Sequence, residues 1–105
     1  MELLQAIKER RTIRKFKAEP VPRELLEQLI KNAMWAPSAM NEQPWKFYVL
    51  TGESKEGLVH ISEGCIEKLD LRMQKLFDEK MRKLVRGYFK NFGGAPAIVA
   101  VVTRM

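Results

Sequence analysis

"WAPSAMNEQPW", residues 35–45, is the stretch that decides the fold. Pro37 and Pro44 stiffen its two ends, because a proline ring fixes the backbone angle φ. Between the prolines lie side chains whose donors and acceptors suit a planar heterocycle, namely Ser38, Asn41 and Gln43. We expect Trp35 and Trp45 to anchor the loop on apolar surroundings. The stretch indicates either a ligand-binding loop or a helix terminator with a capping serine.

A cationic segment, "RRTIRKF", precedes this loop at residues 10–16. Its β-branched and aromatic residues favour an extended backbone. In an extended backbone Arg10, Thr12 and Arg14 point to one face. Two guanidiniums and a hydroxyl on one face can hold a phosphate group. The alternative is a solvated linker whose arginines pair with nearby glutamates, for which the sequence offers Glu2, Glu9 and Glu24.

Hydrophobic periodicity predicts an alternation of helices and strands. The expected helices cover residues 2–9, about 22–35, a short stretch capped by Ser54, and a long stretch from about 64 to 91. The expected strands cover residues 46–52 and 97–103. Pro22 and Glu24 suit the first turn of the second helix. "NFGGAP", with two glycines and a proline, is expected to end the long helix.

Two segments carry more apolar surface than a small chain can cover. The second helix is expected to bury one face, made of Leu25, Leu26, Leu29, Ile30, Ala33 and Met34. "AIVAVVT", residues 97–103, is a continuous apolar run typical of a central strand buried on both faces. Only one other segment makes a good strand. We therefore expect neighbouring strands from a partner chain or a longer parent protein, or else a compromised fold.

Composition limits the class of protein. The 105 residues predict one domain, residues 1–105, and the hydrophobic content of 46% argues against disorder. The net charge of +6 favours an anionic partner or a solvated basic surface. Cys65 and His60 are the single cysteine and histidine, so we expect no disulfide and no metal site, and a nucleophile pair is disfavoured. Without an apolar span or a secretory leader, a cytoplasmic protein is expected.

At this spacing the two segments resemble the nitroreductase family of flavin-dependent oxidoreductases. The resemblance rests on "RRTIRKF", "EPVPRELLEQLI", "WAPSAMNEQPWKFYVL" and, less specifically, "GGAPAIVAVV". It covers residues 1–52 well and 93–103 loosely. It implies an α+β fold in which helices pack on a small, mainly antiparallel sheet. Family members are markedly longer, so the fold is expected to be truncated, without the family's C-terminal half.

The resemblance also implies FMN bound at a homodimer interface. By similarity, the FMN phosphate, the ribityl chain and the pyrimidine edge would be held by Arg10, Arg11, Thr12 and Arg14. The partner subunit would supply contacts to the same flavin from Pro37, Ser38, Ala39 and Asn41, with Gln43 as a further candidate. Thr12 stands where the family more often has serine, and it keeps the hydroxyl.

The implied chemistry belongs to the flavin, which would carry hydride from NAD(P)H to a nitroaromatic or quinone-like acceptor. No side chain is then needed as general acid or base, and Arg14 is the candidate for the cation that favours the reduced ring.

Several alternatives stay open beside an active enzyme. The chain can be a fragment, a half-length relative that rebuilds the site by oligomerising, or a fold that has lost its flavin. A non-catalytic dimerisation or flavin-binding module is the strongest of them. A basic amphipathic helix at 64–91 could also bind lipid or nucleic acid. Its cations, however, are interleaved with acids such as Glu67 and Asp70. We therefore expect no nucleic-acid and no membrane partner.

Overall fold

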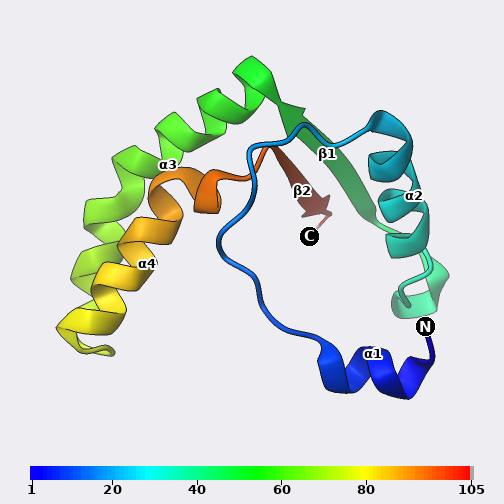
Figure 1. The fold of residues 1–105 in the computed structure, drawn as a ribbon, viewed down its shortest axis with the longest axis horizontal. Coiled ribbons are helices and arrows are strands. Elements are labelled where there is room, and N and C mark those ends of the chain that lie inside the picture. The colour runs from blue at the N-terminus through cyan, green and yellow to red at the C-terminus, as the bar shows by residue number, and fades with distance from the viewer. Residues whose placement is uncertain (105) are drawn as a thin grey trace.

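A small sheet joins two arms of helical structure in a computed structural model, which describes residues 1–104 (Figure 1). The chain runs α1 (Leu3–Glu9), α2 (Arg23–Ala33), the short 3-10 helix η1 (Ala39–Asn41), β1 (Trp45–Thr51), α3 (Gly52–Met73), α4 (Glu79–Asn91), a second 3-10 helix η2 (Phe92–Gly94) and β2 (Ala97–Thr103). Figure 1 shows α3 and α4 side by side on one side of the sheet and α2 on the other. The elements form an open arch.

The sheet is antiparallel and, over the described residues, contains β1 and β2 alone. Trp45 lies opposite Thr103, and Val49 lies opposite Val99. This confirms the expected α+β class and the antiparallel pairing. The expectation that residues 97–103 are buried on both faces is wrong for this chain. No second strand flanks β2 among the described residues, and Val101 is 61% exposed.

Two helices, α3 and α4, replace the predicted short helix and the predicted long helix at 64–91. Helix α3 begins one residue after Thr51, whose side chain and that of Ser54 form a capping box. The chain then turns over residues 74–78 and starts α4 after Asp78, whose side chain accepts a hydrogen bond from the Met81 amide at 2.8 Å. The prediction of one continuous helix was therefore wrong. Apolar residues continue at a helical spacing through the turn, so the sequence pattern does not reveal it.

The two helices pack as an antiparallel hairpin. Ser62 Oγ donates a 2.8 Å hydrogen bond to the carbonyl oxygen of Phe89. Tyr88, Phe89 and Phe92 form an edge-to-face aromatic cluster with ring centroids 5.2 to 6.1 Å apart. These contacts hold the C-terminal end of α4, and with it η2, at a defined place beside the sheet.

The first two helices take little part in the packing. The main contacts among the described residues join β1 with β2, α3 with α4, and α3 with the sheet. On the expected buried face of α2, Leu25 is 47% and Leu29 is 53% exposed. That face was predicted correctly as amphipathic but wrongly as buried, because no element of the described chain covers it. Met73 and Ala95 are the buried hydrophobic residues in residues 1–104.

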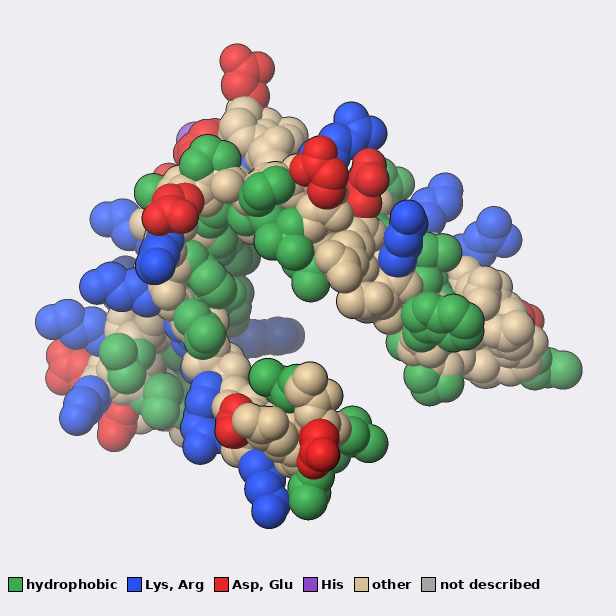
Figure 2. Space-filling model, turned by 45° about the vertical axis from the view of Figure 1, so that its right-hand side comes forward, with side chains coloured by type: hydrophobic (Ala, Val, Ile, Leu, Met, Phe, Trp, Pro, Cys, Tyr) green, Lys and Arg blue, Asp and Glu red, His purple; other side chains and the backbone are tan. Residues whose placement is uncertain are grey.

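The chain is expanded for its length. Its accessible surface is 9539 Å², whereas a compact monomer of this mass exposes about 6,100 Å². Its radius of gyration is 16.4 Å, against about 13 Å for a compact domain of this size. Figure 2 shows hydrophobic side chains open to solvent along the arms and a wide gap between the arms. No helix in residues 1–104 is both long and apolar enough to cross a bilayer.

Candidate functional site

The cationic segment leaves α1 and carries its arginines into solvent. Arg10 is the residue that follows the last turn of α1, and its Nη1 donates to Thr12 Oγ1 at 3.3 Å. The two side chains therefore lie together, as the extended-backbone argument predicted. Arg11 Nη1 donates to the carbonyl oxygens of Lys8 at 3.0 Å and of Arg10 at 2.9 Å. The Arg11 guanidinium therefore lies against the C-terminal end of α1.

No carboxylate neutralises this segment in the described chain. The ion pairs of residues 1–104 lie elsewhere, at Arg23–Glu27, Lys55–Glu56, Arg82–Asp70 and Arg86–Asp70. The alternative in which Glu2, Glu9 or Glu24 pairs with the arginines is thus not what the structure shows. Arg10, Arg11 and Arg14 keep their positive charge available to an anion. Guanidinium groups of this kind can bind a carboxylate or a phosphate group.

The proline loop is held by its own polar groups. The Gln43 amide donates to Ser38 Oγ at 3.0 Å, and Gln43 Nε2 donates to Asn41 Oδ1 at 3.2 Å. Ser38 and Asn41 therefore both stabilise the loop from within. Gln43, the weaker candidate in the sequence, is the residue that links them. In the described chain the Asn41 side-chain NH₂ group makes no hydrogen bond, so it can donate to a ligand.

Three non-glycine residues in this loop have a left-handed backbone. Met40, Asn41 and Gln43 have φ angles of 52°, 54° and 48°. Such conformations cost on the order of 1 kcal/mol each and gather at functional sites. The side chain of Met40 is 94% exposed, so packing does not explain its conformation. The loop therefore has a backbone conformation that side-chain packing at Met40 does not account for. Trp35, predicted as an apolar anchor, is 89% exposed, and that prediction was wrong.

The structure does not bring the two segments together within one chain. Among residues 1–104 no hydrogen bond and no ion pair joins residues 10–14 to residues 37–43. In Figure 1 the cationic segment leads into the open middle of the arch, whereas the proline loop follows the far end of α2. Within one chain, the structure thus shows the two segments as separate groups of polar residues.

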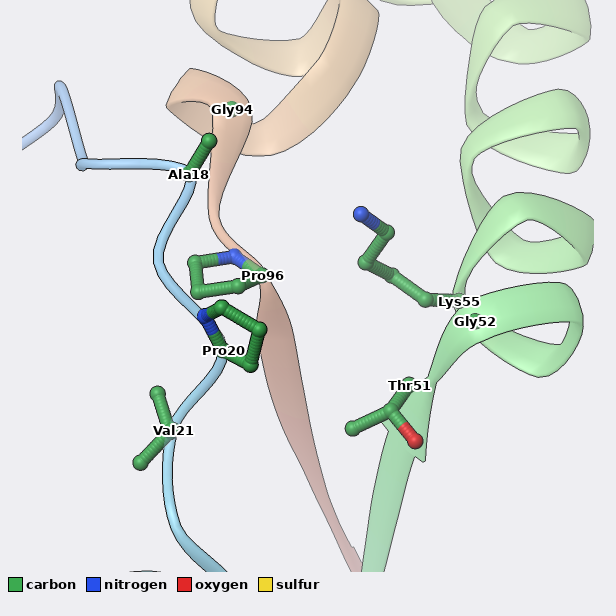
Figure 3. A pocket seen from close by; sticks show the side chains of 8 residues that line it. All are labelled: Ala18, Pro20, Val21, Thr51, Gly52, Lys55, Gly94 and Pro96. Atoms are coloured by element: carbon green, nitrogen blue, oxygen red, sulfur yellow. The ribbon is translucent and has the colours of Figure 1, made fainter.

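Two hollows among the described residues are lined by no residue of either segment. One hollow of about 420 Å³ is lined by Ala18, Pro20, Val21, Thr51, Gly52, Lys55, Gly94 and Pro96 (Figure 3). The Lys55 side chain extends into it from α3. A charged groove of about 990 Å³ runs between α3 and α4. None of the nine predicted site residues lines either space.

One strong electrostatic contact escaped the sequence analysis. Asp70 is 9% exposed and accepts hydrogen bonds from Arg82. These hydrogen bonds hold the pKa of the Asp70 carboxyl below its ordinary value, against the opposing effect of desolvation, and the charge of Arg86 adds to the lowering. The pair spans the turn at 74–78. Only knowledge of that turn could have predicted it.

Comparisons of the whole chain with known proteins point to one family. The model of the nitroreductase family matches residues 7–105. Chloronitrobenzene nitroreductase from Comamonas testosteroni is 48% identical over 50 residues, which are 48% of this chain and 22% of that protein. A crystal structure of a BluB-like flavoprotein from Clostridium difficile 630 has 31% identity and a TM-score of 0.71. The match covers 99% of this chain and 49% of the flavoprotein chain.

An FMN-dependent nitroreductase from Clostridium difficile R20291 gives the same result. It is 30% identical with a TM-score of 0.67, and the match covers 93% of this chain and 42% of that one. The chain thus spans half or less of the length of these similar proteins, which confirms the expected truncation of the fold. With the family model covering nearly every residue, the chain belongs to the nitroreductase family.

Proposed function

We propose that this chain forms part of an FMN-dependent oxidoreductase that takes hydride from NAD(P)H and passes it to a nitroaromatic or quinone-like acceptor. The observation that carries the proposal is the cationic segment, where Arg10 lies beside the Thr12 hydroxyl and no carboxylate in residues 1–104 neutralises Arg10, Arg11 or Arg14. The similar proteins support the cofactor, since they include a flavoprotein and an FMN-dependent nitroreductase.

The residues present fit FMN in chemical type. Arg10 and Arg11 bind the phosphate, Thr12 donates one further hydrogen bond, and Arg14 supplies positive charge toward the flavin ring. Ser38 and Asn41 orient the polar edge of the ring, while Pro37 and Ala39 pack on it and Gln43 holds the loop in shape. When bound, FMN supplies the hydride-transfer chemistry. The chain itself provides binding, orientation and charge, so no side chain is assigned a catalytic role.

Two copies are required by this assignment, because each chain holds half of the site. We propose a homodimer or higher oligomer in which the cationic segment of one subunit faces the proline loop of its partner. The accessible surface exceeds that of a compact monomer by about 3,400 Å². Large obligate interfaces bury about 2,000–5,000 Å² in total. Residues 1–105 would act as one domain within this assembly, in the cytoplasm.

A second candidate function follows from the openness of the fold. With Val101 exposed on the two-stranded sheet and Leu29 exposed on α2, the chain could serve as a dimerisation module that has lost its catalysis. This module would assemble without taking up flavin. Assembly and flavin binding therefore have to be measured separately.

Titration of the purified protein with FMN tests the proposal directly. We expect the flavin absorption band to shift and the flavin fluorescence to change as a saturable complex forms, and the complex to be reduced by NADH or NADPH. The Arg10→Ala, Arg11→Ala double variant should bind FMN weakly under the same conditions. An assembled protein that takes up no FMN would reject the oxidoreductase and favour the dimerisation module.

A further inference from the structure

Gly93 meets the cationic segment at a point where no side chain would fit. The Phe16 amide donates a 2.9 Å hydrogen bond to the Gly93 carbonyl oxygen. A Cβ built on Gly93 would collide with the carbonyl oxygen of Arg14 and would lie 3.2 Å from Phe16 Cδ2. Gly93 also has φ of +69°, a conformation that glycine adopts without cost. The close approach and the left-handed backbone both require glycine here.

The hydrogen bond between Phe16 and Gly93 holds a segment that has little other support. Residues 11–21 lie in no helix or strand, and within the described chain the Phe16 hydrogen bond is the backbone–backbone bond that fixes them. Gly93 lies in η2, directly after α4. Because the α3–α4 hairpin and β2 fix η2 from both sides, Gly93 is a rigid support for the residues that pass over it.

We propose that Gly93 is a positioning residue for the arginines that bind the flavin phosphate. It lets the backbone of Arg14 lie against η2. The position of Arg14 is then fixed, and with it the course of the chain that carries Arg10 and Arg11. An added methyl group would push the Arg14 carbonyl away and release the Phe16 hydrogen bond. The arginines would then lose their common alignment while their charges remained. This inference rests on the proposed function, since it names a residue that positions the same site.

Gly94 provides a matched control. It has φ of +75°, so an alanine there meets the same backbone penalty, but its added Cβ would lie 3.8 Å from the Phe16 carbonyl oxygen, an ordinary contact. Comparing Gly93→Ala with Gly94→Ala therefore separates the collision with Arg14 from the cost of alanine at positive φ. The exchange of the amide hydrogens of β1 and β2 shows whether each variant keeps its sheet.

Two measurements on the ligand-free and ligand-bound chain test the inference. The first is hydrogen exchange at the Phe16 amide without ligand, which should be protected in the unaltered protein and in Gly94→Ala and unprotected in Gly93→Ala. The second compares the dissociation constants of FMN and riboflavin, which lacks the phosphate. We expect Gly93→Ala to weaken FMN on the order of tenfold, as one lost charge-assisted hydrogen bond would, and to weaken riboflavin less.

Each outcome decides a different claim. Equal Phe16 protection and equal FMN binding in the two glycine variants would overturn the role of Gly93. Equal losses of FMN and riboflavin would show a general defect, and they too would overturn it. An unaltered protein that does not prefer FMN to riboflavin would reject the proposed phosphate site itself. If Gly93→Ala loses its sheet, Phe16→Pro removes the same hydrogen bond with Gly93 intact and should weaken FMN selectively.

Discussion

Asp70 receives two hydrogen bonds from the guanidinium of Arg82 across the α3–α4 hairpin, with Nε donating to Oδ1 at 3.1 Å and Nη2 to Oδ2 at 2.9 Å. Arg86 Nη1 lies 3.6 Å from Oδ2 of the same carboxylate. Asp70 lies in α3 and both arginines lie in α4. The cluster therefore helps to hold α3 against α4, although the apolar spacing of the sequence had predicted a single helix there.

Replacing Asp70 with Asn should lower the melting temperature of the protein. The change leaves Arg82 without its bidentate acceptor, and removing one member of a partly buried pair destabilises more than losing an exposed pair. The control is Arg23→Gln, which breaks the exposed Arg23–Glu27 pair on α2. That pair is worth about 0.3–0.5 kcal/mol. Equal thermal shifts in the two variants, measured by circular dichroism, would contradict a structural role for Asp70.

The hairpin should be weakened by acid through the same carboxylate. The pKa of Asp70 is lowered from its ordinary value of 3.8 in the folded protein, so the folded state binds this proton less readily than the unfolded state. Its contribution to stability is fully present above the ordinary pKa and is lost as the pH falls through the lowered one. The difference in melting temperature between the unaltered protein and Asp70→Asn should therefore shrink below about pH 4. A difference that stays constant down to the lowest pH would refute this linkage.

Local sequence patterns predicted where helices and strands lie better than they predicted what packs around each of them. The strand at 97–103 was placed at its observed bounds, and the strand at 46–52 was placed within one residue, because β-branched and aromatic runs decide them locally. The turn at 74–78 was missed because it contains neither glycine nor proline. The one sequence signal for the turn is Asp78 followed by the acidic Glu79, a pair typical of the start of a helix, and α4 begins there. An apolar stripe does not show whether another element packs on it, so the sequence could not predict that α2 and β2 are exposed.

For the candidate site, the sequence predicted residue types but not the contacts that hold them. Residue types at 10–14 and 37–43 indicated donors for a phosphate and a heterocycle. The internal bracing of the loop by Gln43 and the support of Phe16 by Gly93 depend on three-dimensional contacts. Neither has a signal in sequence spacing, apart from the paired glycines of "NFGGAP".

Replacing Arg10 with Ala should weaken FMN binding by about 1.5–3 kcal/mol, the scale of a hydrogen bond to a charged group. Lys83, exposed on α4, is the matched control, since its loss removes the same charge from a place far from the cationic segment. Lys83→Ala should leave the FMN dissociation constant nearly unchanged. Similar losses at both positions, measured by fluorescence titration, would mean general electrostatic attraction and no defined phosphate site.

The protein should be an oligomer at micromolar concentration. Its excess of exposed surface and its open β2 edge favour burial against a second copy. Light scattering coupled to size exclusion measures this directly. Val101→Lys places a charge on the exposed face of β2 and, if that face is buried in the assembly, should shift the mass toward the monomer. A stable, folded monomer of the unaltered chain would remove the basis for a shared site.

Mixing two inactive variants tests the central claim, that the arginines of one chain and the proline loop of another build one flavin site. One chain carries Arg10→Ala and Arg14→Ala, and the other carries Ser38→Ala and Asn41→Ala. A mixed dimer then has one intact site and one doubly altered site. We predict that neither variant binds FMN alone and that binding partly returns after subunit exchange. Exchange demonstrated by mass spectrometry with no return of binding would show that the site is not shared between subunits.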